Sequence, residues 1–309
     1  MSNDRGQSSR RPVGSGRTAT LLRRIRHKIT STRVRVPIVW WRHLGLRAED
    51  VMLGSYPRSG STWLRFTLFE ILTGEAAGFD SVNAAFRGMS DYKDSRPLLP
   101  GQGRFIGTHE SYRDSYRRAV YLVRDVRDVA LSEFAYERSR GVGRERLDDY
   151  LKDMLLGRKR HGSWQHHVEC WLDSPLASSG GLLLVRYEDL RKDSVEWFMK
   201  IVDFLRVKVD RRAVETAIAN NSVERMREKE DRLYTQEDYS SVPRRPLKGA
   251  QPNERFVRSG KVGGWQGRLS EEQLRFIEQY TGTVLLRLGY PVNTQGSVDS
   301  SLPAPASVG

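Results

Sequence analysis

Four short apolar runs that alternate with longer amphipathic segments constrain the fold of this chain most strongly. They span residues 51–56, 104–108, 119–124 and 182–187, and the segments between them carry apolar residues at helical spacing. Strands that are apolar throughout and are separated by helices form a parallel sheet covered by helices on its faces. We therefore predict an α/β fold: a single domain with a central parallel sheet flanked by helices.

The sequence directly after the first run, PRSGSTW at residues 57–63, has the composition of an anion-binding loop. It is rich in Ser and Gly, and apolar residues at helical spacing follow it from Leu64 to Leu72. A loop at a helix start presents unpaired backbone N–H groups and the positive end of the helix dipole, and Arg58 adds a full charge. The loop lacks the G-x-x-x-x-G-K-[ST] spacing that cradles a triphosphate. We predict a P-loop-like site for a different anion.

The net charge of +14 is concentrated at the N-terminus. Residues 1–48 hold 12 Lys and Arg against one acid, Asp4, so the remainder of the chain is nearly neutral. We expect a basic, partly disordered tail over residues 1–49, a folded domain over residues 50–293 and a disordered tail over residues 294–309. Basic charge in a tail, rather than on a patterned folded face, argues against a nucleic-acid partner.

Within the basic tail, the pattern of residues 21–29 predicts one amphipathic helix. Three roles stay open for this tail: a solvated segment, a peripheral contact with an anionic membrane, or an organellar transit peptide. No uncharged apolar run approaches about 18 residues, so we expect no membrane span. Cys170 is the only cysteine, which fits a reducing compartment. We expect a cytoplasmic protein, with peripheral membrane attachment as the alternative.

The loop resembles the phosphosulfate-binding loop of the sulfotransferase family, the enzymes that use 3′-phosphoadenosine 5′-phosphosulfate (PAPS). The usual form of that loop is Y-P-K-S-G-[TS]-T-W, and Arg58 stands where the family usually has Lys. The resemblance implies a phosphosulfate-binding loop here. The residues that it assigns to the cofactor are Arg58, Ser59, Gly60, Ser61, Thr62 and Trp63.

A second stretch, VYLVRDVRDVALSEF, runs from the third apolar run into a helix. Arg124 at the strand end and Ser132 two turns along the helix could both face the crevice where open α/β sheets bind ligands. The stretch is similar to the family's R-x-x-[KR]-D-x-x-x-S motif, which implies that both residues hold the 3′-phosphate of the cofactor. We expect Arg127 and Asp128 to form ion pairs on the helix surface, and a surface ion pair is also the alternative for Arg124.

His109 directly follows the second apolar run, at a strand end where a base is useful. A lone His at a strand end is otherwise often structural. The family carries K-T-H-x-P here and uses the His as general base, so the resemblance implies that role for His109. Gly107 and Ser111 replace the family's Lys and Pro. Arg58 or Arg113 could supply the positive charge that Gly107 lacks.

The segment GSWQHHVECWL at residues 162–172 looks like the family's G-S-W-x-x-H-V-x-x-W helix beside the acceptor pocket. The resemblance makes His167 a substrate-binding candidate. The spacing of His166 and Cys170 would permit metal ligation, but no third ligand or supporting shell is evident, so we expect no metal. Three residues of the segment are expected in the core: Trp164, Val168 and Trp171.

Three later segments extend the resemblance. Tyr187 ends the fourth apolar run in the family's Y-E-D pattern, near the adenine. Ser222 matches T-S-F-x-x-M, although Val223 replaces its aromatic residue. Residues 258–265, RSGKVGGW, resemble the R-K-G-x-x-G-D-W loop that closes over the 3′-phosphate. The cofactor-binding residues implied there are Arg258, Ser259 and Gly260, with Ser259 in place of the family's Lys and Gly264 in place of its Asp.

These motifs, in order over roughly residues 50–290, identify the chain as a PAPS-dependent sulfotransferase. The resemblance implies in-line transfer of a sulfonate group to a hydroxyl or amine, with His109, Arg58 and Ser132 as catalytic residues and a small-molecule, sugar or lipid acceptor. The alternative is a P-loop-type nucleotide or small-molecule kinase. The charged segment 227–262, rich in Pro and Gly, is predicted to be a lid or binding loop.

Overall fold

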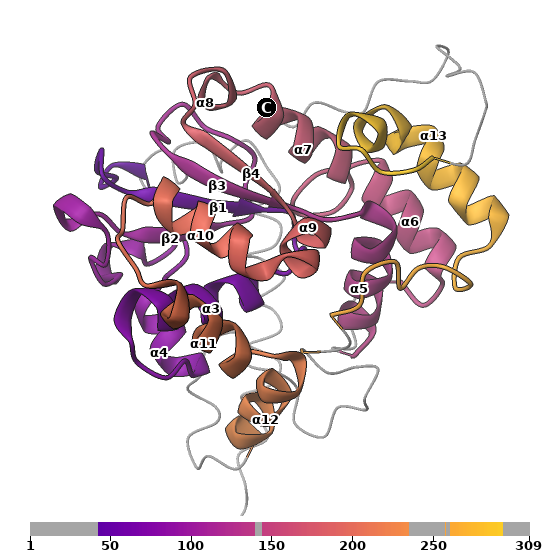
Figure 1. Ribbon diagram of the computed structural model, residues 1–309. Helices are drawn as coiled ribbons and strands as arrows, with labels where there is room; N and C mark the ends of the chain where they lie inside the picture. Colours follow the sequence, from indigo (N-terminus) through magenta and orange to yellow (C-terminus); the bar gives the residue numbers. More distant parts are fainter. Residues whose placement is uncertain (1–42, 140–143, 235–256, 258–259, 293–309) are drawn as a thin grey trace, which may run out of the picture. The chain divides into compact units, whose positions relative to one another are not determined.

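The computed structural model describes residues 43–139, 144–234, 257 and 260–292 (Figure 1). The chain divides into a unit that ends at Leu44 and a unit that begins at Gly45, and all of the strands and helices that are named below belong to the second.

Four parallel strands form the central sheet, in the order β2-β1-β3-β4. The strands are β1 (Val51–Ser55), β2 (Phe105–Thr108), β3 (Ala119–Val123) and β4 (Leu182–Arg186). Each of the four predicted strands is confirmed to within one residue at either end. Both faces of the sheet are buried, which explains why these strands are apolar throughout.

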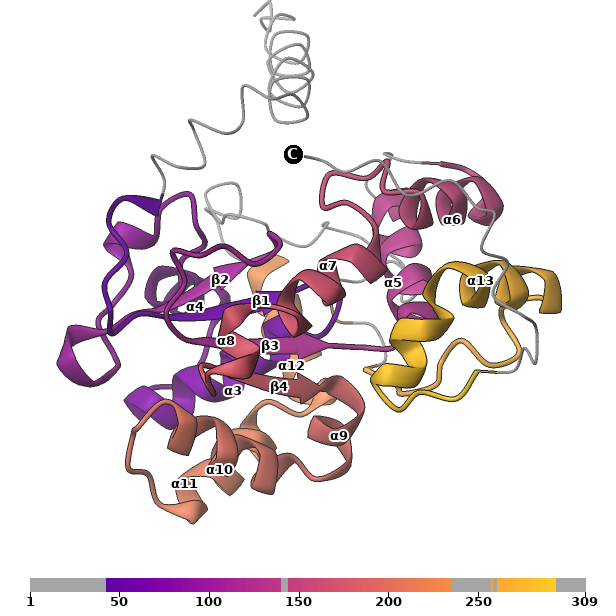
Figure 2. The ribbon, with the colours of Figure 1, turned by 90° about the horizontal axis from the view of Figure 1, so that it is seen from above.

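Helices cover both faces of the sheet, as Figures 1 and 2 show. Val51 and Leu53 of β1 pack on one face, and Met52 packs on the other, because successive side chains of a strand alternate. The first face is covered by α3 (Ser61–Thr73), α4 (Phe79–Ala85), α10 (Ser194–Phe204) and α11 (Arg211–Asn220). The second is covered by α5 (Val126–Ser139), α6 (Leu147–Leu155), α7 (Trp164–Leu172) and α13 (Glu271–Arg287).

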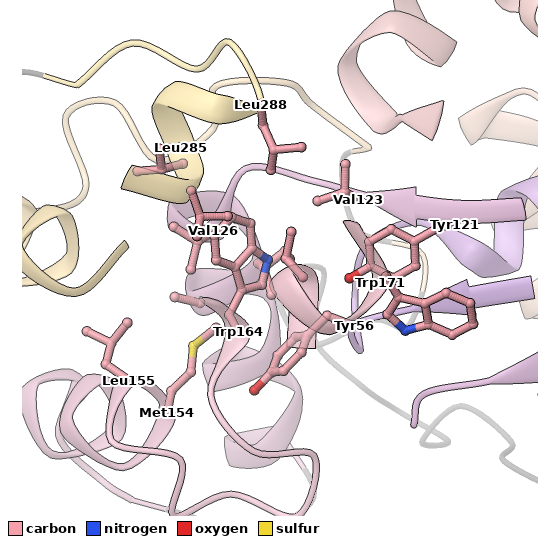
Figure 3. Packing of buried hydrophobic residues seen from close by; sticks show 14 of the residues in the cluster. Tyr56, Tyr121, Val123, Val126, Met154, Leu155, Trp164, Trp171, Leu285 and Leu288 are labelled. Atoms are coloured by element: carbon pink, nitrogen blue, oxygen red, sulfur yellow. The ribbon is translucent and has the colours of Figure 1, made fainter. Parts of the chain in front are cut away.

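Aromatic side chains form the core between α7 and the sheet (Figure 3). Tyr121 of β3 stacks on Trp171 with ring centroids 5.1 Å apart and planes at 17°. Gly54 of β1 lies so close beneath this ring that a Cβ would come within 2.6 Å of Trp171. The core positions predicted for Trp164, Val168 and Trp171 are confirmed, since all three side chains are fully buried.

The remaining elements are short apart from α12. They are α8 (Pro175–Ser178), α9 (Tyr187–Lys192), α12 (Val223–Tyr234) and the 3₁₀ turns η1 (Tyr92–Asp94) and η2 (Pro100–Gln102). The prediction of an irregular segment over 227–262 is wrong for its first part, which belongs to α12. The Ser222 hydroxyl accepts from the backbone N–H of Arg225, and Met226 and Glu230 are buried, so capping and packing stabilise a helix of highly charged sequence.

Arg127 and Asp128 of α5 are buried, so their predicted place on the helix surface is wrong. The side chain of Arg127 is only 1% exposed. It donates to Asp125 at 2.7 Å and to Glu278 of α13 at 3.1 Å, and it lies 4.2 Å from the centroid of the Trp265 ring. Residues far along the chain cover this side of α5, so the local sequence could not reveal its burial.

The two tails fall largely outside the described residues. The predicted amphipathic helix at 21–29, the basic tail up to residue 42 and the C-terminal tail from residue 293 all lie there, as do residues 235–256 of the predicted lid. Among the helices that are described, none is long and apolar enough to cross a membrane.

Truncation of Arg127 should strongly destabilise the protein. Arg127→Ala removes the guanidinium that pairs with the buried carboxylates of Asp125 and Glu278, which should lower the free energy of unfolding by about 3–5 kcal/mol. The control is Arg144→Ala, which removes an ion pair with Asp153 from a side chain that is 56% exposed. That change should cost less than about 1 kcal/mol. Equal losses in urea unfolding would contradict the buried-pair interpretation.

Candidate functional site

Each strand of the sheet is followed, just beyond its carboxyl end, by a predicted site residue or by the predicted loop. His109 follows β2, Tyr56 and the Ser/Gly loop follow β1, Arg124 follows β3 and Tyr187 follows β4. Parallel pairing brings all four to one edge of the sheet, in that order. Neighbouring strands are about 4.8 Å apart, so the row spans roughly 14 Å. The loop and Arg124 adjoin at the point where the strand order reverses, which is where open α/β sheets bind ligands.

The loop after β1 has the features of an anion cradle. Its Gly60 has φ +101° and precedes α3, and no side chain caps the first turn of that helix. A Cβ on Gly60 would lie 2.5 Å from Tyr187, so both the backbone conformation and the close approach require glycine. The hydroxyl oxygen of Ser59 is buried and has no hydrogen-bond partner among the described residues. Unpaired N–H groups and a buried hydroxyl suit an oxyanion.

Arg58 lies in the loop with φ +66°, an uncommon conformation for a residue with a side chain. Its Nε donates to the Ser132 hydroxyl at 3.3 Å, and its guanidinium lies 4.8 Å from the centroid of the Tyr136 ring. Burial lowers the pKa of Arg58, and repulsion by Arg124 adds to this shift. The structure thus brings Arg58 and Ser132 together and puts Arg124 within electrostatic reach.

Arg124 has one hydrogen-bond partner on the helix that follows it and another in a segment far along the chain. Its Nη2 donates to Asp128 at 3.2 Å and to the backbone carbonyl of Lys261 at 2.8 Å, while the guanidinium lies 4.5 Å from the centroid of the Tyr187 ring. Asp128 also accepts from the backbone N–H of Gly263 at 3.0 Å. Burial raises the pKa of Asp128. Arg124 therefore forms the ion pair of the alternative interpretation but is buried, and its Nε has no partner among the described residues.

Tyr187 and Trp63 connect the loop to later parts of the chain. The Tyr187 hydroxyl donates to the carbonyl of Gly260 at 2.9 Å, and its ring centroid is 6.3 Å from that of Trp63. Trp63 donates through Nε1 to the carbonyl of Asn221 at 2.8 Å. Four of the segments that carry the resemblance therefore meet around these two aromatic rings.

The other predicted cofactor residues have varied positions. Ser61 and Thr62 occupy the first turn of α3 and are partly exposed. The hydroxyl of Ser222 caps α12, so its predicted contact with the cofactor stays a prediction. Two of the predicted residues lie outside the described part of the chain: Arg258 and Ser259.

A cavity of about 420 Å³ lies between α9 and residues 260–262. Its lining consists of Glu188, Asp189, Arg191, Lys192, Gly260, Lys261 and Val262. Glu188 accepts from the Tyr290 hydroxyl at 2.6 Å, and Asp189 lies 3.8 Å from the Arg186 guanidinium. Three basic and two acidic side chains line this cavity.

The hydrogen bond of the His109 ring determines its tautomer. Its Nδ1 lies 2.8 Å from the carbonyl oxygen of Ser55. A carbonyl can only accept, so the proton is on Nδ1 and the lone pair is on Nε2. A Cβ on Gly107 would meet nothing within 4 Å, so packing does not exclude the family's Lys there. Arg113 is 43% exposed and pairs with Glu110, whereas Arg58 is partly buried in the loop itself.

His167 is fully buried in the core, with its Nδ1 2.9 Å from the Tyr121 hydroxyl and its ring against Tyr56. Burial lowers the pKa of His167 to about 3, so it is neutral near pH 7. Its predicted contact with substrate stays a prediction. A second histidine, His161, was not predicted to lie near the site, yet its Nδ1 donates to the carbonyl of His109 at 3.0 Å. Its only sequence signal is its place directly before the GSW motif.

His166 and Cys170 lie on the solvent side of α7, with Sγ 3.4 Å from Nε2. The described residues contain no group of three or more His, Cys, Asp or Glu side chains that could hold a metal ion.

Residues 48–289 match the family described as "Sulfotransferase domain". The chain belongs to this family. It is 27% identical to sulfotransferase 2A6 of Rattus norvegicus over 247 residues, which cover 76% of this chain and 84% of the rat protein. It is 26% identical to flavonol 3-sulfotransferase of Flaveria bidentis over 252 residues, 75% of this chain and 80% of that protein.

Solved sulfotransferase-fold structures superpose on this one. Mouse sulfotransferase SULT7A1, solved with PAP, has a TM-score of 0.58 at 23% identity and covers 77% of this chain and 84% of its own. Retinol dehydratase, solved with retinol and PAP, has a TM-score of 0.58 at 24% identity, with 78% and 82% covered. The predicted family and the α/β fold are confirmed: the chain is a sulfotransferase, and the kinase alternative is not favoured.

The buried His167 should make this sulfotransferase sensitive to acid. In the unfolded chain a histidine has a pKa near 6.5, whereas His167 in the fold has a pKa of about 3. As the pH falls below 6.5, the unfolded chain therefore binds a proton that the fold excludes, and stability is lost. The slope is at most about 1.4 kcal/mol per pH unit for each proton.

The variant His167→Gln should lose this one contribution and keep that of His161, whose pKa burial also lowers. Urea unfolding between pH 7 and pH 5 should therefore show a slope shallower by up to about 1.4 kcal/mol per pH unit in the variant. Parallel stability curves for the two proteins would mean that His167 takes up its proton in the folded state.

Proposed function

We propose that this sulfotransferase transfers a sulfonate group from PAPS to a hydroxyl or amine group of a small molecule, with His109 as the general base. One observation carries the assignment of the base. The Nδ1–H of His109 donates to the carbonyl of Ser55, the last residue of β1, at 2.8 Å, which assigns the lone pair of the ring to Nε2. A strand-end histidine in this tautomer can take a proton without first losing one.

The residues of the loop and of β3 fit a donor with two separate phosphate-bearing ends. Among the described residues, the buried hydroxyl of Ser59 has no hydrogen-bond partner and no side chain caps the first turn of α3, and both features suit one end. The guanidinium of Arg124, whose Nε also has no partner in that part of the chain, suits the other. PAPS supplies an electrophilic sulfonate and a bisphosphate leaving group. Because fixed cations and N–H dipoles already surround the loop, the proposed transfer needs no metal ion.

In the proposed reaction the acceptor oxygen or nitrogen forms a bond to sulfur as the bond from sulfur to the bridging oxygen breaks. His109 Nε2 takes the proton of the acceptor, and the carbonyl of Ser55 continues to accept from Nδ1–H and stabilises the imidazolium. Arg58 and the loop N–H groups stabilise the negative charge that develops on the leaving oxygen. Ser132 contributes as a catalytic residue by holding the Arg58 guanidinium.

For the nucleoside portion, we assign Arg124 and Ser132 to the 3′-phosphate and Tyr187 and Trp63 to the neighbourhood of the adenine. The family motifs imply these roles. Two hydrogen bonds support these roles: one from Arg124 to Lys261 and one from Tyr187 to Gly260. Both connect the RSGKVGGW segment to the same edge of the sheet.

The acceptor that we propose is a hydroxyl-bearing small molecule. A 3-alpha-hydroxysteroid sulfotransferase of Cavia porcellus is 27% identical to this chain over 249 residues, 76% of this chain and 83% of that protein. The Flaveria bidentis relative is named for a flavonol. Sugars and lipids are the alternatives, and nucleic acid is not expected. A screen of hydroxysteroids, flavonols, sugars and lipids with labelled donor and mass spectrometry identifies the class.

Replacing His109 tests the mechanism. His109→Ala should lower turnover of an unactivated alcohol by about 10²–10⁴-fold, because the proton acceptor is lost. PAP affinity should change little, since the loop and Arg124 are untouched. The matched control is His166→Ala on the exposed side of α7, which should retain wild-type turnover. A folded His109→Ala protein that keeps more than about a tenth of normal turnover would contradict the base assignment.

A further inference from the structure

The turn at His161 and Gly162 is fixed to the site from two directions. His161 Nδ1 donates to the carbonyl of His109 at 3.0 Å, and the Tyr56 hydroxyl donates to the carbonyl of Gly162 at 3.0 Å. Tyr56 opens the anion loop and is 2% exposed. The turn therefore belongs to the construction of the site edge, although it comes more than fifty residues after His109 in the chain.

His161 also contacts the imidazole ring of His109. The two ring centroids are 5.8 Å apart and the planes meet at 76°, an edge-to-face arrangement. Two contacts thus act on one residue: a hydrogen bond fixes the backbone of His109, and a ring fixes the side on which its imidazole can lie. With the backbone and ring held, the Nδ1 of His109 stays within reach of the Ser55 carbonyl at 2.8 Å.

The charge state of His161 suits this arrangement. Burial lowers the pKa of His161 well below its ordinary value, and repulsion by His109, Arg160 and His167 lowers it further. His161 is therefore neutral near pH 7. A neutral ring can keep its Nδ1–H donor without placing a second positive charge beside the imidazolium that forms when His109 takes up a proton.

We propose that His161 is a positioning residue, which holds the His109 imidazole in the Nδ1–H tautomer. This role rests on the proposed function, since it matters for turnover only if His109 is the base. His161 acts through His109 rather than on the donor or the acceptor. Without it, His109 can leave the Ser55 carbonyl and adopt the tautomer mixture of an unrestrained imidazole.

Three variants separate the possible roles of His161. His161→Phe keeps a ring of similar size but cannot donate to the His109 carbonyl. His161→Asn loses the ring, and its amide N–H can replace the Nδ1 donor. His166→Phe is the control on the exposed side of the neighbouring helix. Melting temperature and PAP affinity are measured on each variant, and His161→Leu replaces His161→Phe if the latter does not fold.

The first readout is independent of turnover. In histidine-labelled protein, nitrogen-proton NMR correlations should show a single Nδ1–H tautomer for His109 in the wild type and in His166→Phe. His161→Phe should show a mixture of tautomers, and His161→Asn should restore the single form. A single, unchanged tautomer in His161→Phe, or in His161→Leu where it replaces that variant, would overturn the proposal, whatever the activity of the variant.

The second readout is a double-mutant cycle on an unactivated alcohol. His161→Phe should lower kcat by about 10- to 100-fold, the size of a modest misplacement of a catalytic group. In the His109→Ala background it should cause no further loss, because both changes remove the same function. If the two losses of kcat multiply in the double variant, His161 acts independently of His109, and the proposal is overturned. A wild type with the single tautomer but no sulfonate transfer would refute the proposed function and leave the positioning role supported.

Discussion

The parallel pairing of β1 with β2 on one side and β3 on the other determines where every part of the site lies. Since all four strands point the same way, their carboxyl ends form one edge of the sheet. The residues that directly follow the strands therefore lie along this edge. The spatial order of those residues differs from their order in the chain: His109 comes first, then the loop, Arg124 and Tyr187. A ligand that lies along this edge would meet the proposed base, the proposed anion cradle, a guanidinium and an aromatic ring in that order.

The charges at this edge are held by internal partners before any ligand binds. Arg58 donates to Ser132, and Arg124 donates to Asp128 and to the Lys261 carbonyl. Such anchoring limits the reorganisation that a bound anion requires, which is how fixed dipoles and cations stabilise developing charge. Gly107 removes one positive charge that the family usually has nearby. The partly buried guanidinium of Arg58, which replaces the family's Lys in the loop, is the cation best placed to compensate.

The strands and the loop of the site could be predicted from the sequence, because local sequence patterns determine them. Strands buried on both faces show as apolar runs, and a loop that must contain Gly60 shows as a motif. The burial of Arg127 could not be predicted, because Glu278 of a distant helix and Trp265 cover it. The same holds for His161, whose contact with His109 spans 52 residues of chain.

The predicted loop at 227–262 illustrates a third kind of failure. A charged sequence without clear periodicity was expected to be irregular, yet α12 forms over Val223–Tyr234. Its stability depends on contacts to other elements. Lys229 pairs with Glu70 of α3 at 3.1 Å, and the buried Glu230 accepts from the backbone N–H of Val257 at 2.9 Å. Tertiary packing of this kind outweighs weak local propensity.

A crystal structure of the protein with the 3′,5′-bisphosphate product bound would test most directly whether the strand ends form one donor site. We predict that the 5′-phosphate contacts the N–H groups and hydroxyls of residues 58–62. The 3′-phosphate should lie within hydrogen-bond distance of Arg124, and the adenine should lie beside Tyr187. We further predict that His109 lies at the end of the site farthest from the adenine. A bisphosphate bound away from the loop, or with its 3′-phosphate remote from Arg124, would contradict this prediction.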